Sequence, residues 1–120
     1  MERIVVGLIE MEQQFRILHW QTKSFARHKA YGEIYGNLGD LIDSFMESCM
    51  GEYGRFELTD GAIQLKNLDE MTVGPALEEY IQFLLSFNEE FDPAKDSDLL
   101  NIRDEMLADV KQLKYLLTLK

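Results

Sequence analysis

Apolar residues recur along most of this 120-residue chain at intervals of three and four positions. That spacing gathers them on one face of an α-helix, because each residue turns a helix by about 100°. Four segments carry the pattern: Ile4–Thr22, Tyr31–Cys49, Leu77–Phe91 and Leu99–Leu117. The chain has only two prolines, the residue least compatible with a helix interior. The pattern therefore predicts an all-α protein with four helices.

Turn and cap residues separate these helices. The first connection, over residues 23–27, is a short turn that returns the second helix antiparallel to the first. The third connection is also short, but residues 52–73 form a long, weakly periodic stretch. Two short hairpins joined by one long crossover define a ferritin-like four-helix bundle, here a single domain over residues 1–120. The boundary residues are Ser24 as a cap, Gly51 and Gly54 as stops, Gly74-Pro75 as a start, Asp92-Pro93 as a stop, and Asp96 or Ser97 as a cap.

Charge and hydropathy exclude several classes of partner. The net charge is -10 and basic residues are scattered, so we expect no nucleic-acid partner, whose phosphates would be repelled. No segment approaches the roughly 20 apolar residues that span a bilayer, and the N-terminus lacks the features of a signal peptide, so we expect no membrane association. The single cysteine, Cys49, fits a buried core position in a reducing compartment. These features predict a cytoplasmic protein.

The first helix is apolar on more than one side. Val6, Ile9, Ile17 and Trp20 lie far around the helix from its main apolar stripe. A helix that is apolar on two sides is buried against something besides its own core. We interpret this second side as a subunit contact.

The second helix has a second face as well, made of small and acidic residues. Glycine inside a helix costs about 1 kcal/mol relative to alanine, so three glycines on one stripe need a compensating reason, such as close approach of another helix. The same stripe on a second copy is the simplest source of that helix. We therefore expect a homodimer through the first and second helices. The residues of this face are Gly32, Gly36, Gly39, Asp40, Asp43 and Glu47.

Carboxylates buried at such an interface would repel one another unless a cation neutralised them. Imidazoles combined with carboxylates suit Fe(II), Mn(II) or Zn(II), and the chain has only two histidines, His19 and His28. Structural interpretations remain open beside this one. Asp43 and Glu47 can be solvated surface acids, His19 can bond a backbone carbonyl or Glu12, and His28 can cap or pack at the turn.

A family resemblance supports the metal hypothesis. The segment Leu18-His19-Trp20, Phe25-Ala26, His28, and then Asp43 and Glu47 resembles the ferroxidase segment of the Dps family of mini-ferritins. The resemblance implies that His19 and His28 of one subunit meet Asp43 and Glu47 of another around iron. We add Asp40, on the same face of the second helix, as an outer candidate. It also implies Fe(II) oxidation and storage of iron mineral inside a shell of subunits.

A second hypothesis keeps the fold without the chemistry. The two histidines are nine residues apart, three fewer than in that family, and Gly32 stands where the family has an acid. These differences favour a non-catalytic helical oligomerisation or interaction module with a degenerate metal site. The sequence thus leaves two functions open, a possible ferroxidase and an assembly module.

Overall fold

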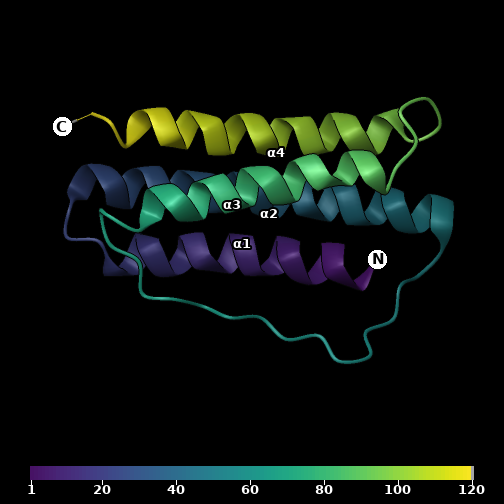
Figure 1. Cartoon of the computed structure of the whole chain (residues 1–120), viewed down its shortest axis with the longest axis horizontal. Coiled ribbons are helices and arrows are strands. Elements are labelled where there is room, and N and C mark those ends of the chain that lie inside the picture. The colour runs from purple at the N-terminus through teal and green to yellow at the C-terminus, as the bar shows by residue number, and fades with distance from the viewer. Residues whose placement is uncertain (120) are drawn as a thin grey trace.

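The computed structural model describes residues 1–119, and within them the chain is all-helical (Figure 1). Four α-helices and one short 3-10 helix form, and these residues include no β-strand. The prediction of an all-α protein with four helices is confirmed. None of these helices is both long enough and apolar enough to cross a membrane. The elements are α1 (Glu2–Gln21), α2 (Phe25–Tyr53), α3 (Val73–Leu85), η1 (Ser86–Glu89) and α4 (Ser97–Leu116).

The ends of α2 follow local chemistry. The Ser24 hydroxyl accepts a hydrogen bond from the Arg27 N–H at 3.2 Å, which caps the helix as expected. Because this cap fixes the start at Phe25, the predicted turn over residues 23–27 is wrong in its second half, which is helical. At the other end Gly54 has φ 84°, a conformation that glycine adopts without strain.

The apolar faces of the helices meet in one core. α2 packs against α1 and α4, and α3 packs against α4. Aromatic rings pack between the helices. The ring centroids of Phe45 and Phe87 lie 5.5 Å apart, and so do those of Phe15 in α1 and Tyr80 in α3. Cys49 is buried in this core, as predicted, and burial raises the pKa of its thiol.

Residues 54–72 run back along the outside of the bundle beside α1 (Figure 1). Side chains of α1 hold this connection by its backbone. The Gln14 amide pairs with both backbone groups of Lys66, accepting from its N–H at 2.8 Å and donating to its carbonyl at 2.9 Å. Glu2 accepts from the N–H groups of Thr59 and Asp60. The connection is therefore attached to α1 along the length of that helix.

This attachment accounts for part of the second apolar side of α1. A Cβ atom at Gly61 would lie 3.2 Å from Val6, so the chain itself covers part of that residue, which is half-buried. The subunit contact on this side of α1 stays a prediction. Ile9 and Trp20 stay open, with 42% and 64% of their surface exposed.

α3 is shorter than its apolar pattern predicts. It begins at Val73, two residues before Pro75, and ends at Leu85, although the pattern runs to Phe91. Side chains take its last carbonyls: buried Arg103 of α4 donates to the Leu84 carbonyl, and the hydroxyl of Ser86, directly after the helix, donates to that of Phe83. With these groups satisfied by side chains, the chain tightens into η1.

The start of α4 uses its cap residue in an unexpected way. Asp96 is the residue before the helix, as predicted, but its carboxylate makes no cap bond within α4. It accepts instead from the Asp92 N–H and from the Tyr53 hydroxyl at the end of α2. The bond to Asp96, with a smaller contribution from burial, raises the pKa of Tyr53 to about 12.

Candidate functional site: the histidine pair and the open face of α2

The two histidines lie together at the corner where α1 meets α2. Their rings stack with centroids 3.9 Å apart and planes 15° apart. Each ring bonds the other residue's backbone: Nδ1 of His19 lies 2.6 Å from the His28 carbonyl oxygen, and Nδ1 of His28 lies 2.8 Å from that of His19. The expectation that His19 bonds a backbone carbonyl is confirmed, and so is a capping role for His28.

These bonds fix the chemistry that remains available to each ring. A carbonyl oxygen only accepts hydrogen bonds, so both Nδ1 atoms must carry a proton. In the neutral imidazole the lone pair is then on Nε2, which is the atom left for a ligand or a metal ion. The corner therefore holds two imidazoles whose tautomers are set by the backbone.

Gly32 is explained by this pair and not by a partner helix. A Cβ atom at Gly32 would lie 2.7 Å from Cε1 of His19, so only glycine leaves room for the ring. This corrects the interpretation of the glycine stripe at that position. The other two glycines differ from it. A Cβ atom at Gly39 would lie 3.9 Å from a carboxylate oxygen of Glu12, and a Cβ atom at Gly36 would have nothing within 4 Å.

The predicted acidic ligands lie elsewhere on the same helix. Asp43 and Glu47 are exposed and follow His28 by 15 and 19 residues, which places Asp43 about 22 Å further along α2. Within residues 1–119, no three histidine, cysteine, aspartate or glutamate side chains are grouped closely enough to hold a metal ion. One copy of the chain therefore brings the histidines together but does not bring them to the acids.

Asp40, the outer candidate, lies at the boundary of α2 with α4. It lines a shallow surface depression together with Asn37 and with Glu105 and Asp109 of α4. Neither histidine lines this depression. The structure thus gives Asp40 no contact with the imidazole pair.

Charged and aromatic groups of α1 border the open face of α2, which is the exposed side of that helix with Gly36, Asp43 and Glu47. Burial raises the pKa of Glu12, and the nearby negative charge of Asp43 adds to that effect while Arg16 opposes it. The Arg16 guanidinium lies over the Tyr35 ring at 4.9 Å and near the Trp20 ring at 5.9 Å. Sequence reasoning missed Arg16, because its role depends on rings from two helices.

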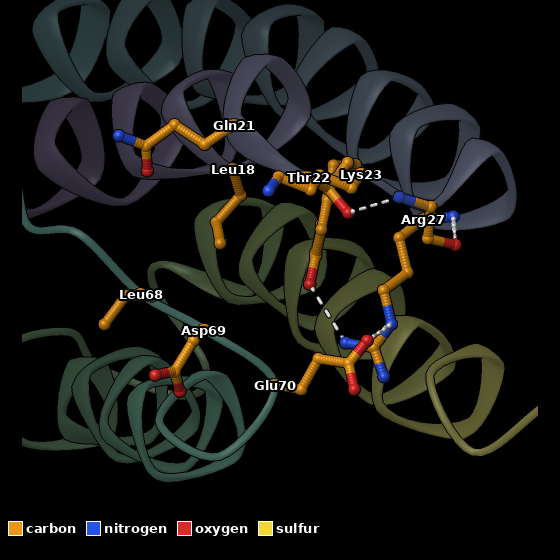
Figure 2. A pocket seen from close by; sticks show the side chains of 10 residues that line it. Leu18, Gln21, Thr22, Lys23, Arg27, Leu68, Asp69 and Glu70 are labelled. Atoms are coloured by element: carbon orange, nitrogen blue, oxygen red, sulfur yellow. Dashed lines mark hydrogen bonds and ion pairs between the residues drawn. The ribbon is translucent and has the colours of Figure 1, made fainter.

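A cavity of about 430 Å³ lies on the other side of the same corner, between the α1–α2 turn and residues 68–70 (Figure 2). Arg27 is its central charge. It donates to the Leu117 carbonyl at 3.3 Å and pairs with Glu70 at 3.9 Å. Asp69 and Lys23 add one further charge of each sign to the lining. The two contacts of Arg27 tie the end of α4 and the connection to α2, so the charge at the centre of this cavity has a structural role.

Fold and surface together define a small, acidic, all-α protein with a stacked histidine pair at one helical corner and an exposed face on α2. The chain belongs to a family described as "Family of unknown function (DUF5856)", whose model matches residues 19–117. It is also 34% identical, over 94% of its length and 84% of the relative's, to a protein of Enterobacteria phage T4 described as "Uncharacterized 14.6 kDa protein in mobD-ri intergenic region". No solved structure matches the chain.

These comparisons overturn the resemblance to the Dps family. The family that matches is a different one, and its match includes both histidines, Asp43 and Glu47. The resemblance depended on a few polar positions within about 30 residues of two amphipathic helices. Such spacings recur because helical periodicity alone imposes them. The iron chemistry and the shell that the resemblance implied therefore lose that support.

Proposed function

We propose that this protein is a non-catalytic helical assembly module that pairs with a second copy through the outer face of α1 and α2. The observation that carries the proposal is the open strip of α2 at Gly36, where a Cβ atom would meet nothing within 4 Å. Two large aromatic residues, Trp20 and Phe25, border the strip with 64% and 74% of their surface exposed. Aromatic residues are enriched in the cores of protein interfaces, and a glycine lets a second backbone approach closely.

Substitution at Gly36 tests this proposal. Leucine at Gly36 fits an isolated subunit, because the position is open, but it would hold a second helix away. We expect sedimentation velocity to show a concentration-dependent dimer for the wild type and a monomer of unchanged helix content for Gly36→Leu. Gly51→Leu is the matched control, since Gly51 is equally open and lies near the end of α2. A wild-type protein that stays monomeric up to millimolar concentration would overturn the proposal.

Metal binding is a second candidate, supported by the fixed tautomers of the histidine pair. Both Nε2 atoms carry lone pairs, and a second copy that ran antiparallel could bring Asp43 or Glu47 toward them. The ions that suit nitrogen and carboxylate oxygen together are Fe(II), Mn(II) and Zn(II). In this hypothesis His19, His28, Asp43 and Glu47 are the ligands, and oxidation of Fe(II) stays a prediction.

Calorimetric titration with Zn(II) and anaerobic Fe(II) separates the two candidates. A metal site requires binding by the wild type that weakens at least about tenfold in both His28→Asn and Glu47→Ala. The assembly module requires a dimer that persists in excess chelator. Aerobic Fe(II) titration adds a readout for oxidation: if ferric absorbance grows no faster with wild type than with Glu47→Ala, the ferroxidase hypothesis is wrong.

Two further assignments belong to the proposal. Two helical hairpins joined by a long connection are the arrangement expected of a ferritin-like bundle, and we propose that class for the order of α1 to α4. The cytoplasmic location also stays a prediction. It is consistent with the single buried cysteine, since thiols are kept reduced there.

A further inference from the structure

The exposed face of α2 is symmetric about Gly36. Three pairs of residues stand at equal distances on its two sides: Gly32 and Asp40 four residues away, Lys29 and Asp43 seven away, and Phe25 and Glu47 eleven away. All seven positions fall within a strip about 80° wide on the helix. Six of them are exposed, and the seventh, Gly32, is half-buried under His19.

The charges on this strip are complementary across its centre. Lys29 lies in the half toward the N-terminus of α2, whereas Asp40, Asp43 and Glu47 lie in the other half. Within residues 1–119, neither Lys29 nor Asp43 takes part in an ion pair. The Lys29 ammonium lies over the Phe25 ring, 5.5 Å from its centroid. The strip therefore presents unpaired charges of opposite sign at matched positions.

A second copy of the same helix fits this strip in one orientation. When two copies run antiparallel with Gly36 on the two-fold axis, Lys29 of each copy faces Asp43 of the other. Phe25 then lies against the aliphatic stem of Glu47. A parallel arrangement would place Asp43 against Asp43, and like charges at an interface disfavour association. Charge thus selects the antiparallel register.

We infer that two copies of this chain pair through α2 in antiparallel orientation, with Gly36 at the axis and two symmetric Lys29–Asp43 ion pairs. This inference rests on the proposed self-association and specifies its geometry. It also gives Asp43, one of the three acids in this half of α2, a counter-charge from protein.

Charge reversal tests the register. Lys29→Glu and Asp43→Lys each place like charges together twice in the dimer, so we expect each to raise the dimer dissociation constant at least about tenfold at 0.15 M salt. The double variant Lys29→Glu/Asp43→Lys restores opposite charges and the original net charge. It should return the dissociation constant to within about threefold of the wild type.

Controls separate register from net charge and from self-association itself. Lys111→Glu on α4 changes the net charge as Lys29→Glu does and is exposed, yet should leave the dimer intact. Gly36→Cys in a Cys49→Ser background should cross-link with a short bis-maleimide, whereas Gly51→Cys should not. A dimer that forms, but that Lys29→Glu weakens no more than Lys111→Glu does, overturns the register and leaves self-association standing. A wild-type monomer overturns both.

Discussion

The histidine pair shows how single residues close the corner between α1 and α2. The His19 carbonyl belongs to the last turn of α1, where backbone oxygens lack partners within the helix. His28 donates to that oxygen, and His19 donates in return to the His28 carbonyl. His28 therefore caps the end of α1, whereas His19 adds a bond to the backbone of the first turn of α2, and the two rings stack between these bonds.

Gly32→Ala should break this arrangement. The new methyl group would lie 2.7 Å from the His19 ring, which the two carbonyl bonds hold in place. We expect the free energy of unfolding to fall by about 1–3 kcal/mol from overpacking, in spite of alanine's higher helix propensity. Chemical denaturation measures the loss, and histidine ring resonances in NMR spectra report the displaced ring.

Gly51→Ala is the control for Gly32→Ala, because its methyl group meets nothing within 4 Å. It should leave stability unchanged or raise it by up to about 1 kcal/mol. If the two variants behave alike, then the close contact between His19 and Gly32 has no energetic weight and our explanation of that glycine is wrong.

Glu12 should make stability depend on pH. Burial raises its pKa above the usual 4.5, so the folded state favours the protonated carboxyl. The stability that the protein has with Glu12 protonated is fully present below pH 4.5 and is lost as pH rises through the raised pKa of Glu12. Glu12→Gln should therefore be more stable than the wild type at pH 7, and the difference should vanish at pH 4.

Urea denaturation at both pH values measures the effect of Glu12→Gln, with exposed Glu57→Gln as the matched control. An equal gain for Glu12→Gln at pH 7 and pH 4 would contradict the assignment, because it would not come from ionisation.

At the scale of elements, the helices could be predicted from the sequence, but their ends and the contacts between them could not. Apolar spacing located all four helices because each buries one face in a common core. It overestimated the length of α3, since the end of that helix depends on Arg103, which lies on another helix. It also gave Gly32 and Gly36 one role, although only the fold shows which of them lies under a side chain. Whether the histidines meet Asp43 was beyond sequence reasoning, because within one copy they lie far apart and a meeting would depend on the proposed second copy.

The connection over residues 54–72 should depend on Gln14. This side chain is 1% exposed and satisfies both backbone groups of Lys66. Gln14→Met keeps the volume but removes both bonds, so unfolding free energy should fall by about 1–3 kcal/mol. Hydrogen exchange at the Lys66 amide should also accelerate.

Gln13→Met provides the control for Gln14→Met, because Gln13 bonds only its neighbour Glu12 and is half-buried. Its effect should stay within about 0.5 kcal/mol, with no change in exchange at Lys66. Equal exchange rates in both variants would show that Gln14 does not hold the connection.

At the scale of the whole molecule, pairing must overcome a net charge of -10 on each copy. Repulsion between two such copies is screened over about 8 Å at physiological salt, so local complementarity can outweigh it only at short range. In the proposed dimer the open strip of α2 supplies that contact, because its opposite charges attract and its central glycine permits close approach. The proposed assembly would therefore depend more on one face than on the overall charge.

Trp20 should report this assembly, because it is the sole tryptophan and is exposed beside Arg16 at the edge of the strip. Its fluorescence emission should shift to shorter wavelength as protein concentration rises and water is excluded. Gly36→Leu should keep the long-wavelength emission at all concentrations. An emission maximum that stays constant where sedimentation shows dimer would place Trp20 outside the interface.

The connection beside α1 has a practical consequence for engineering. Its anchors at Asp60 and Gln64 leave residues 61–63 between them, on the outside of the bundle. A reporter peptide inserted after Ala62, or new chain termini opened there by circular permutation, would leave the apolar core untouched. The protein could thus be tagged or split at this point while each helical hairpin stays intact.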